Sequence, residues 1–236
     1  EEVLVFVPKK TTRIKYVFSL VFKDILKVNC DVTSDLDEFL SSDRAKFVYS
    51  DKPHSDDLFF RSSDLLFHRG IENIDTDYVE HEGNNALFPV YDSNSVLPFD
   101  VFSAIFYVVS RYEEYQPYVP DRHGRFTAKL SVSHELNFLN KPIVNIWANI
   151  VRDIILNKYP DFVFPKRTFK FVPTYDIDSA YAYAQKGLVR SIGGYFMSLK
   201  NFNWSEVIQR SRVLFSGFKD PFDTYDLQIE YQRKYN

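Results

Sequence analysis

The chain has 236 residues, a formal net charge of −3 and 45% hydrophobic residues, which is the composition of an ordinary globular protein with room for one large or two modest domains. Acidic and basic residues are mixed along the sequence, which excludes the strongly basic surface of a nucleic-acid-binding protein. The single cysteine excludes an intramolecular disulfide and a cysteine-based zinc site, and no apolar run is long enough to span a membrane.

The first fifty residues predict an α/β fold. Val3–Val7 is a short, continuous apolar run, which is typical of a buried parallel strand. Behind Thr11, which can cap a helix, apolar residues recur at helical spacing from Ile14 to Ile25. Strands are expected at 3–7, 27–33 and 45–49, and helices at 12–25 and 35–41. A strand, a helix and a second strand in this order predict a right-handed crossover.

The next segment, residues 51–97, is irregular, and we expect hairpins or loops that lie on the sheet. Short strand-like pieces within it are expected at 58–61, 65–68 and 86–91. A deeply buried helix follows Pro98 and Asp100, and another opens at Asn140. A linker at 160–167 ends this N-terminal α/β domain, which we place at residues 1–165.

Charged side chains gather between these two helices. Two glutamates at the carboxyl end of the first helix would oppose its dipole, and they therefore need cationic partners. A tight polar loop follows them. The candidate group comprises Arg111, Glu113, Glu114, Asp121, His123 and Arg125. One interpretation is a buried ion network that holds the domain together, and the other is a ligand pocket.

A second segment, residues 166–236, opens with an expected strand at 169–175 that leads into Asp176 and Asp178. Residues i and i+2 of a strand face the same side, so the two carboxylates would share one face. Such a pair can bind a cation with one carboxylate and act as a general base with the other. The alternative is that both acids only end the strand. Helices are expected at 188–199, 204–214 and 222–235.

Several motifs together carry a resemblance to a known family. The chain resembles bacterial polysaccharide-deacetylase (NodB-homology) proteins that have an N-terminal DUF7033-type domain. Residues 166–236 would then be the beginning of the deacetylase-like domain. The matching motifs are Leu97-Pro98-Phe99-Asp100, Ser110-Arg111-Tyr112-Glu113-Glu114-Tyr115, Asp121-Arg122-His123-Gly124-Arg125-Phe126, Lys141-Pro142-Ile143-Val144, Thr174-Tyr175-Asp176-Ile177-Asp178 and Asp220-Pro221-Phe222-Asp223-Thr224-Tyr225.

This resemblance implies a distorted (β/α) barrel and a metal-dependent hydrolase of acetylated carbohydrates. In such proteins a divalent metal, above all zinc, polarises an N-acetyl carbonyl and activates a water molecule. The residue matching Asp176 would act as the general base. The residue matching Asp178 would bind the metal together with two later histidines, and a further histidine would protonate the leaving amine.

The sequence departs from that pattern at two points. Ile177 separates the two acids, and no histidine follows Asp178. We therefore expect a truncated chain that is inactive by itself and holds no metal tightly. Two alternatives stay open. One is a degenerate glycan-binding or scaffolding module without turnover. The other is an unrelated α/β domain in which 169–175 joins the N-terminal sheet.

Expectations for partners and location follow from the same features. A carbohydrate is the expected substrate, and exposed apolar faces could lead the chain to form a homodimer. The absence of disulfides and of a visible signal peptide favours the cytoplasm.

Overall fold

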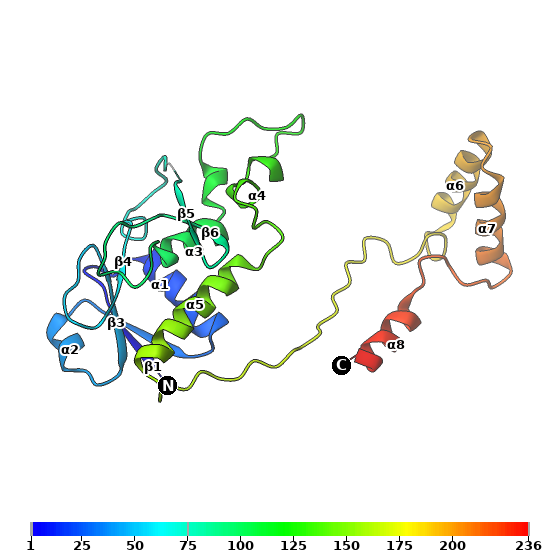
Figure 1. Ribbon diagram of the computed structural model, residues 1–236. Helices are drawn as coiled ribbons and strands as arrows, with labels where there is room; N and C mark the ends of the chain where they lie inside the picture. Colours follow the sequence, from blue (N-terminus) through cyan, green and yellow to red (C-terminus); the bar gives the residue numbers. More distant parts are fainter. Residues whose placement is uncertain (1, 75, 236) are drawn as a thin grey trace. The chain divides into compact units, whose positions relative to one another are not determined.

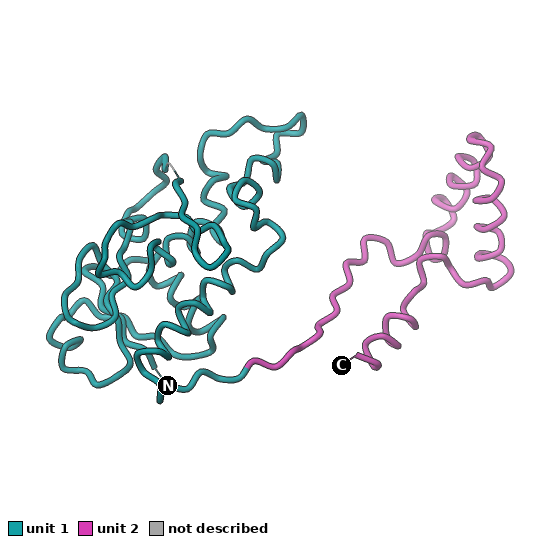
Figure 2. The backbone as a smooth tube through the Cα atoms, in the orientation of Figure 1, with its two compact units in different colours: residues 1–166 teal, residues 167–236 magenta. Residues whose placement is uncertain are grey.

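The structure is a computed structural model that describes residues 2–74 and 76–235. The chain divides into two compact units, residues 1–166 and 167–236 (Figure 2). The boundary between the units falls within the linker expected at 160–167. The identity of the two units as an accessory domain and the start of a deacetylase domain stays a prediction.

A parallel four-stranded sheet forms the centre of the first unit (Figure 1). Its strands are β1 (Glu2–Phe6), β2 (Asn29–Thr33), β3 (Ala45–Ser50) and β4 (Leu58–Arg61). They lie in the order β2-β1-β3-β4, and each neighbouring pair is parallel. The register places Val5 of β1 between Val32 of β2 and Phe47 of β3. The predicted α/β class is confirmed.

Alternate residues of β1 bury opposite faces of the sheet, because successive side chains of a strand point to opposite sides. Val3 and Val5 belong to the larger hydrophobic core, whereas Leu4 and Phe6 belong to a smaller one. The smaller face is covered by α2 (Leu36–Ser41), whose Phe39 is fully buried. Burial on both faces explains why this strand has a continuous apolar sequence.

Three helical segments cover the larger face. They are α1 (Thr12–Phe18), which continues as the π-helix η1 (Ser19–Ile25), α3 (Val101–Val109) and α5 (Ile143–Lys158). Phe102 of α3 lies among aromatic rings from α1, β3 and β4. Trp147 of α5 packs against Phe99 and Phe138. Aromatic side chains therefore make up much of the core of this unit.

The irregular segment contains one hairpin, β5 (Tyr78–His81) paired with β6 (Asn84–Leu87). The strand expected at 65–68 is wrong, because these residues form a turn closed by the Phe67 N–H and the Asp64 carbonyl at 2.8 Å. The carbonyls of Leu65 and Leu66 instead accept hydrogen bonds from Arg13 (2.8 Å) and Thr11 (2.6 Å). Side chains at the start of α1 thus bond the carbonyls that a neighbouring strand would otherwise bond.

Three helices form the second unit, in good agreement with the sequence pattern. They are α6 (Leu188–Lys200), α7 (Trp204–Phe215) and α8 (Tyr225–Tyr235). The strand expected at 169–175 is wrong, because this segment has no regular secondary structure. A strand is stable only with a hydrogen-bonded neighbour, and the described residues of this unit contain no other strand.

Polar groups hold the second unit together. Asp220 is 6% exposed and accepts hydrogen bonds from the N–H groups of Ala182 (2.7 Å), Tyr183 (2.8 Å), Ala184 (3.0 Å) and Phe222 (3.0 Å). The guanidinium of Arg210, which is also buried, lies over the rings of Tyr183 and Tyr195 and bonds Glu206 at 2.8 Å. The loop before α6 and the α6–α7 pair are thereby fixed to each other.

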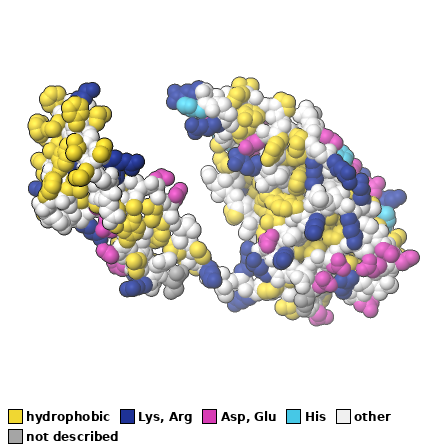
Figure 3. All heavy atoms as spheres, turned by 180° about the vertical axis from the view of Figure 1, so that it is seen from behind, with side chains coloured by type: hydrophobic (Ala, Val, Ile, Leu, Met, Phe, Trp, Pro, Cys, Tyr) yellow, Lys and Arg dark blue, Asp and Glu magenta, His cyan; other side chains and the backbone are white. Residues whose placement is uncertain are grey.

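Large apolar side chains cover the outside of the same unit (Figure 3). On α6, Leu188, Val189, Ile192 and Phe196 are between 67% and 86% exposed. Large exposed apolar patches are a common feature of interaction surfaces. The expected homodimer stays a prediction. In the described parts of the chain, no helix combines the length and the apolar character required to cross a bilayer.

Acidification is expected to destabilise the second unit between about pH 4 and pH 2. Burial alone would raise the pKa of Asp220, but four backbone N–H donors outweigh burial and lower this pKa from 3.8 to about 2. Because the folded-state pKa lies below the unfolded one, the ionised carboxylate stabilises the unit above pH 3.8. This stabilisation, about 2 kcal/mol, is lost as the pH falls toward 2.

The amide proton shifts of Ala182, Tyr183 and Ala184 in an NMR acid titration measure this pKa directly. We expect a common midpoint near 2, which Asp220→Asn removes. A midpoint near the ordinary aspartate value of about 4 would contradict the prediction.

Candidate functional site

Asp176 and Asp178 lie on the irregular stretch that precedes α6. Both are exposed, and neither makes a hydrogen bond or ion pair with another described residue. Because 169–175 is not a strand, the structure does not place the two acids at a strand end. Both carboxylates are therefore open to solvent and unpaired within the described residues.

A zinc site requires three or four nitrogen, sulfur or oxygen ligands that converge on one point. Within residues 2–74 and 76–235, no group of three or more His, Cys, Asp or Glu side chains is arranged to hold a metal ion. Asp176 and Asp178 alone do not fit a zinc site. No chemical step is therefore assigned to a metal on these residues.

Arg111 ends α3 because it adopts the left-handed conformation, with φ of +52°. Glu113 and Glu114 consequently lie in the first turn of a separate 3-10 helix, η2 (Tyr112–Tyr115), and not at the carboxyl end of α3 as expected. Their charge suits that position, since a helix N-terminus favours anions. Glu114 forms a close ion pair with the Arg111 guanidinium.

Glu113 contacts a different element. Its carboxylate accepts a hydrogen bond at 2.8 Å from the Val132 N–H, at the start of α4 (Val132–Glu135). Burial raises the pKa of Glu113, and the hydrogen bond from Val132 opposes that rise. Glu113 thus caps a short helix nineteen residues further along the chain.

The polar loop at 121–125 is closed by its own aspartate. Asp121 Oδ1 accepts hydrogen bonds from the N–H groups of His123 (2.8 Å) and Arg125 (2.9 Å). Gly124 permits the turn with φ of +76°. His123 and Arg125 are exposed. The Asp121 carboxylate, which was expected to join an ion network, therefore bonds the backbone of its own loop instead.

The six charged candidates form two local groups instead of one network. Among the described residues, no hydrogen bond or ion pair connects the 121–125 loop with Arg111, Glu113 or Glu114. None of the six is buried: Arg111, His123 and Arg125 are exposed, and the three acids are half-buried. Arg111 pairs with Glu114, Glu113 bonds Val132, and Asp121 bonds the N–H groups of its own loop. A ligand role for either group stays a prediction.

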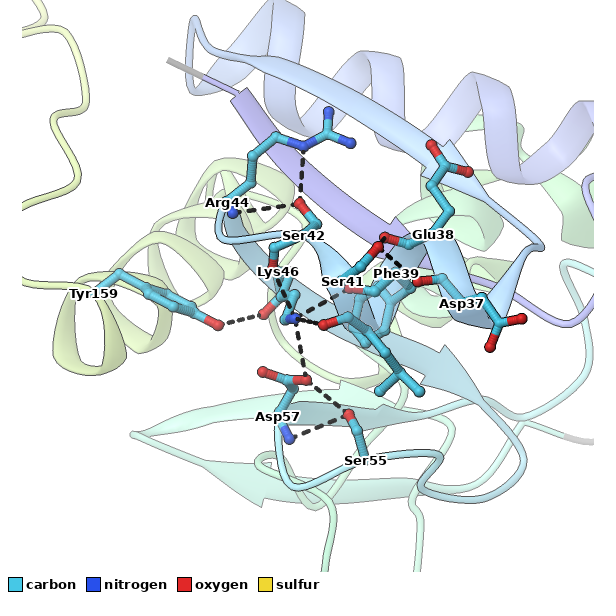
Figure 4. Close-up of polar contacts among 11 residues, drawn as sticks. Asp37, Glu38, Phe39, Ser41, Ser42, Arg44, Lys46, Ser55, Asp57 and Tyr159 are labelled. Carbon is cyan, nitrogen blue, oxygen red and sulfur yellow. Dashed lines mark hydrogen bonds and ion pairs between the residues drawn. The ribbon is translucent and has the colours of Figure 1, made fainter.

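Lys46 is a polar residue whose role the sequence did not reveal (Figure 4). Its ammonium group donates to the carbonyls of Phe39 (3.0 Å), Leu40 (3.2 Å) and Ser42 (2.8 Å), which caps the carboxyl end of α2. Asp57 lies 3.9 Å away. With its three donors occupied, Lys46 acts as a structural cation and not as a free amine. The signal in the sequence was a lone lysine inside an apolar strand.

Asp100 is the most deeply buried carboxylate described, at 1% exposure. It caps α3 by accepting from the Ser103 N–H at 3.0 Å, and the Tyr49 hydroxyl donates to it at 2.9 Å. The N–H and hydroxyl of Ser63 donate to it at 2.6 and 2.9 Å. Burial raises the pKa of Asp100, and the bonds from Ser103 and Ser63 oppose that rise. This network joins β3, the end of β4 and α3.

A shallow cleft of about 530 Å³ lies beside this network, at the carboxyl end of β4. Arg61 and Asp92 face each other there with 3.4 Å between Nη1 and Oδ2. The Ser62 hydroxyl is buried without a hydrogen-bond partner, and the ring of Tyr91 is 93% exposed. Open α/β sheets bind ligands at the carboxyl ends of their strands. The cleft is lined by 61–64 and 89–93.

Comparison with protein families assigns the first unit. A family of unknown function, DUF7033, matches residues 3–160, which is more than half of the chain. The chain belongs to the DUF7033 family. The DUF7033 match includes the sheet, its covering helices and the cleft, and it ends before the second unit. No curated protein and no solved structure matches the chain. The deacetylase resemblance of residues 166–236 stays a prediction.

Proposed function

We propose that this chain is the N-terminal part of a deacetylase-like hydrolase of acetylated sugars, in which the DUF7033 unit binds the glycan. The Asp176 and Asp178 pair supports the hydrolase assignment, because both carboxylates are exposed and unpaired within the described residues. Asp176 would take the proton of the attacking water. By itself the chain would bind sugar without turnover.

The chemistry of the cleft supports glycan binding. Sugar hydroxyls require donors and acceptors close together, and Arg61 with Asp92 supplies both. The exposed ring of Tyr91 offers a flat apolar face for the C–H side of a pyranose. The cleft favours the second candidate function, a glycan-binding module without turnover, as strongly as it favours a substrate-binding domain.

Binding of N-acetylglucosamine oligosaccharides to the 236-residue chain tests the glycan role. We expect Tyr91→Ala or Asp92→Asn to weaken binding by about tenfold in calorimetry, which corresponds to about 1.4 kcal/mol. Tyr16→Ala, which removes an exposed tyrosine of α1 away from the cleft, is the control and should bind normally. Equal affinities for all variants, or no binding of any acetylated oligosaccharide tested, would reject the glycan role of the cleft.

Acetate release distinguishes the hydrolase from the binding module. In the longest natural polypeptide that contains this chain, supplied with zinc, Asp176→Asn is expected to lower the rate of acetate release by about 10²-fold or more, as for loss of a general base. The 236-residue chain should release none. If the longest polypeptide binds oligosaccharide but releases no acetate, the module without turnover is the correct function.

A further inference from the structure

A second depression lies on the opposite edge of the sheet, between α1 with η1 on one side and the edge strand β2 on the other. Its volume is about 620 Å³, which is within the usual size range of small-molecule sites, about 300–1,000 Å³. We call it the α1–β2 groove. It is lined by Glu2, Lys10, Thr11, Thr12, Ile14, Lys15, Phe18, Ser19, Lys23, Asn29, Cys30, Asp31 and Val32.

The floor of the groove is apolar. Ile14 and Phe18 are buried beneath it, and the half-buried Cys30 and Val32 of β2 pack against the same core. Burial raises the pKa of the Cys30 thiol. This thiol is therefore neutral and contributes no negative charge to the floor.

Lysines form the rim. Lys10, Lys15 and Lys23 line the groove and are exposed, and none of them forms an ion pair with another described residue. The two acids of the lining share one cation, because the Arg44 guanidinium bonds Glu2 at 2.7 Å and Asp31 at 3.4 Å. These three groups together carry one negative charge, which is smaller than the charge of the three lysines. The groove therefore carries an excess of positive charge above an apolar floor.

The open edge of β2 is unfavourable for pairing with a further strand. The N–H of Val32 is bonded at 2.9 Å by the carboxylate of Asp31, the residue that precedes it. Charged side chains on an edge strand are one of the devices that oppose the addition of a further strand. This favours a compact ligand over an extended peptide.

We propose that the α1–β2 groove binds a small amphipathic anion, whose apolar body lies on Ile14, Phe18 and Val32 and whose carboxylate, sulfonate or phosphate lies among the three lysines. This site lies apart from the Tyr91 cleft, and it does not depend on the glycan-binding role. It gives the DUF7033 unit a second ligand.

The probe is 8-anilino-1-naphthalenesulfonate, with N-phenyl-1-naphthylamine as the uncharged analogue of the same ring system. Methyl NMR of the full chain locates binding, because Ile14 and Val32 report on the groove and Ile192 on the exposed face of α6. We expect saturable shifts of Ile14 and Val32. The uncharged analogue should bind the groove about tenfold more weakly, which is the effect of losing two or three exposed charge contacts.

Two sets of variants separate charge from apolar contact. The double variant Lys15→Gln, Lys23→Gln should raise the dissociation constant at the groove by about fivefold to tenfold. The control is Lys129→Gln, at an exposed lysine of the 3-10 helix η3 (Ala128–Leu130), which should leave this constant unchanged. Cys30→Trp, which fills the floor, should abolish the shifts, and Cys30→Ala should keep them. Shifts confined to Ile192, or equal affinity of both probes at the groove, would overturn the proposal.

Discussion

Phe102→Ala is expected to lower the free energy of unfolding of the first unit by about 3–5 kcal/mol, the usual cost of removing a fully buried phenylalanine. Phe102 is 0% exposed. Its ring centroid lies 4.7 Å from that of Phe18, 5.2 Å from that of Tyr49 and 5.5 Å from that of Phe60. The alanine would leave a cavity where α1, α3 and two strands meet, and the surrounding rings cannot all move to fill it.

Urea unfolding followed by Trp147 fluorescence measures this loss. Trp147 is 1% exposed and belongs to the first unit, and Trp204→Phe removes the tryptophan of the second unit. The matched control is Phe106→Ala, in the same helix but only half-buried, which should cost clearly less. Equal effects of the two substitutions would contradict the view that Phe102 is the centre of the core.

Asp100→Ala is expected to destabilise the same unit by about 3–4 kcal/mol. It removes the cap of α3, which contributes about 1 kcal/mol. It also leaves the Ser63 N–H without its acceptor, at about 1–3 kcal/mol, and leaves the buried Tyr49 hydroxyl with only the longer contact to Ser103 Oγ at 3.3 Å. Asp100→Asn should cost less, because its amide oxygen can still cap α3. The same urea experiment compares the variants, and a loss below about 1 kcal/mol for the alanine variant would show that water replaces the missing carboxylate.

The wild-type chain should gain stability relative to Asp100→Asn as the pH is lowered. Burial raises the pKa of Asp100 above its ordinary value of 3.8. Because the folded-state pKa lies above the unfolded one, the stability that Asp100 contributes is fully present below pH 3.8. It is lost as the pH rises through the folded-state pKa. The difference in unfolding free energy between wild type and Asp100→Asn, measured across the acid range, should therefore move in favour of wild type at low pH. The opposite slope would mean that hydrogen bonds outweigh burial.

Much of the fold could be predicted because the signals were local. The apolar run of β1 and the stripe from Ile14 to Ile25 were sufficient to predict a βαβ unit. The helices expected at 188–199 and 204–214 closely match α6 and α7. Asp100 was also expected near the start of α3, and its side chain caps this helix by accepting a hydrogen bond from the Ser103 N–H.

The candidate site could be predicted only in part. The spacing of Asp176 and Asp178 suggested a pair on one face of a strand, but the strand that should carry them is absent from the described residues. A run such as 169–175 has the composition of a strand, and composition does not supply the neighbour that a strand needs. Asp121 was expected in a wider network, yet its carboxylate bonds the N–H groups of its own loop.

By itself, the sequence determined the α/β class, the order of strands and helices in the first fifty residues, the helices of the second unit and the absence of a disulfide. These depend on residue type and on periodicity within a few turns of chain. Only the tertiary structure decided that Lys46 caps α2, that Asp100 joins three elements, and that lysines of one helix form the rim of a groove beside β2. The physical reason is that burial, charge pairing and ladder hydrogen bonds depend on partners that are distant in the sequence.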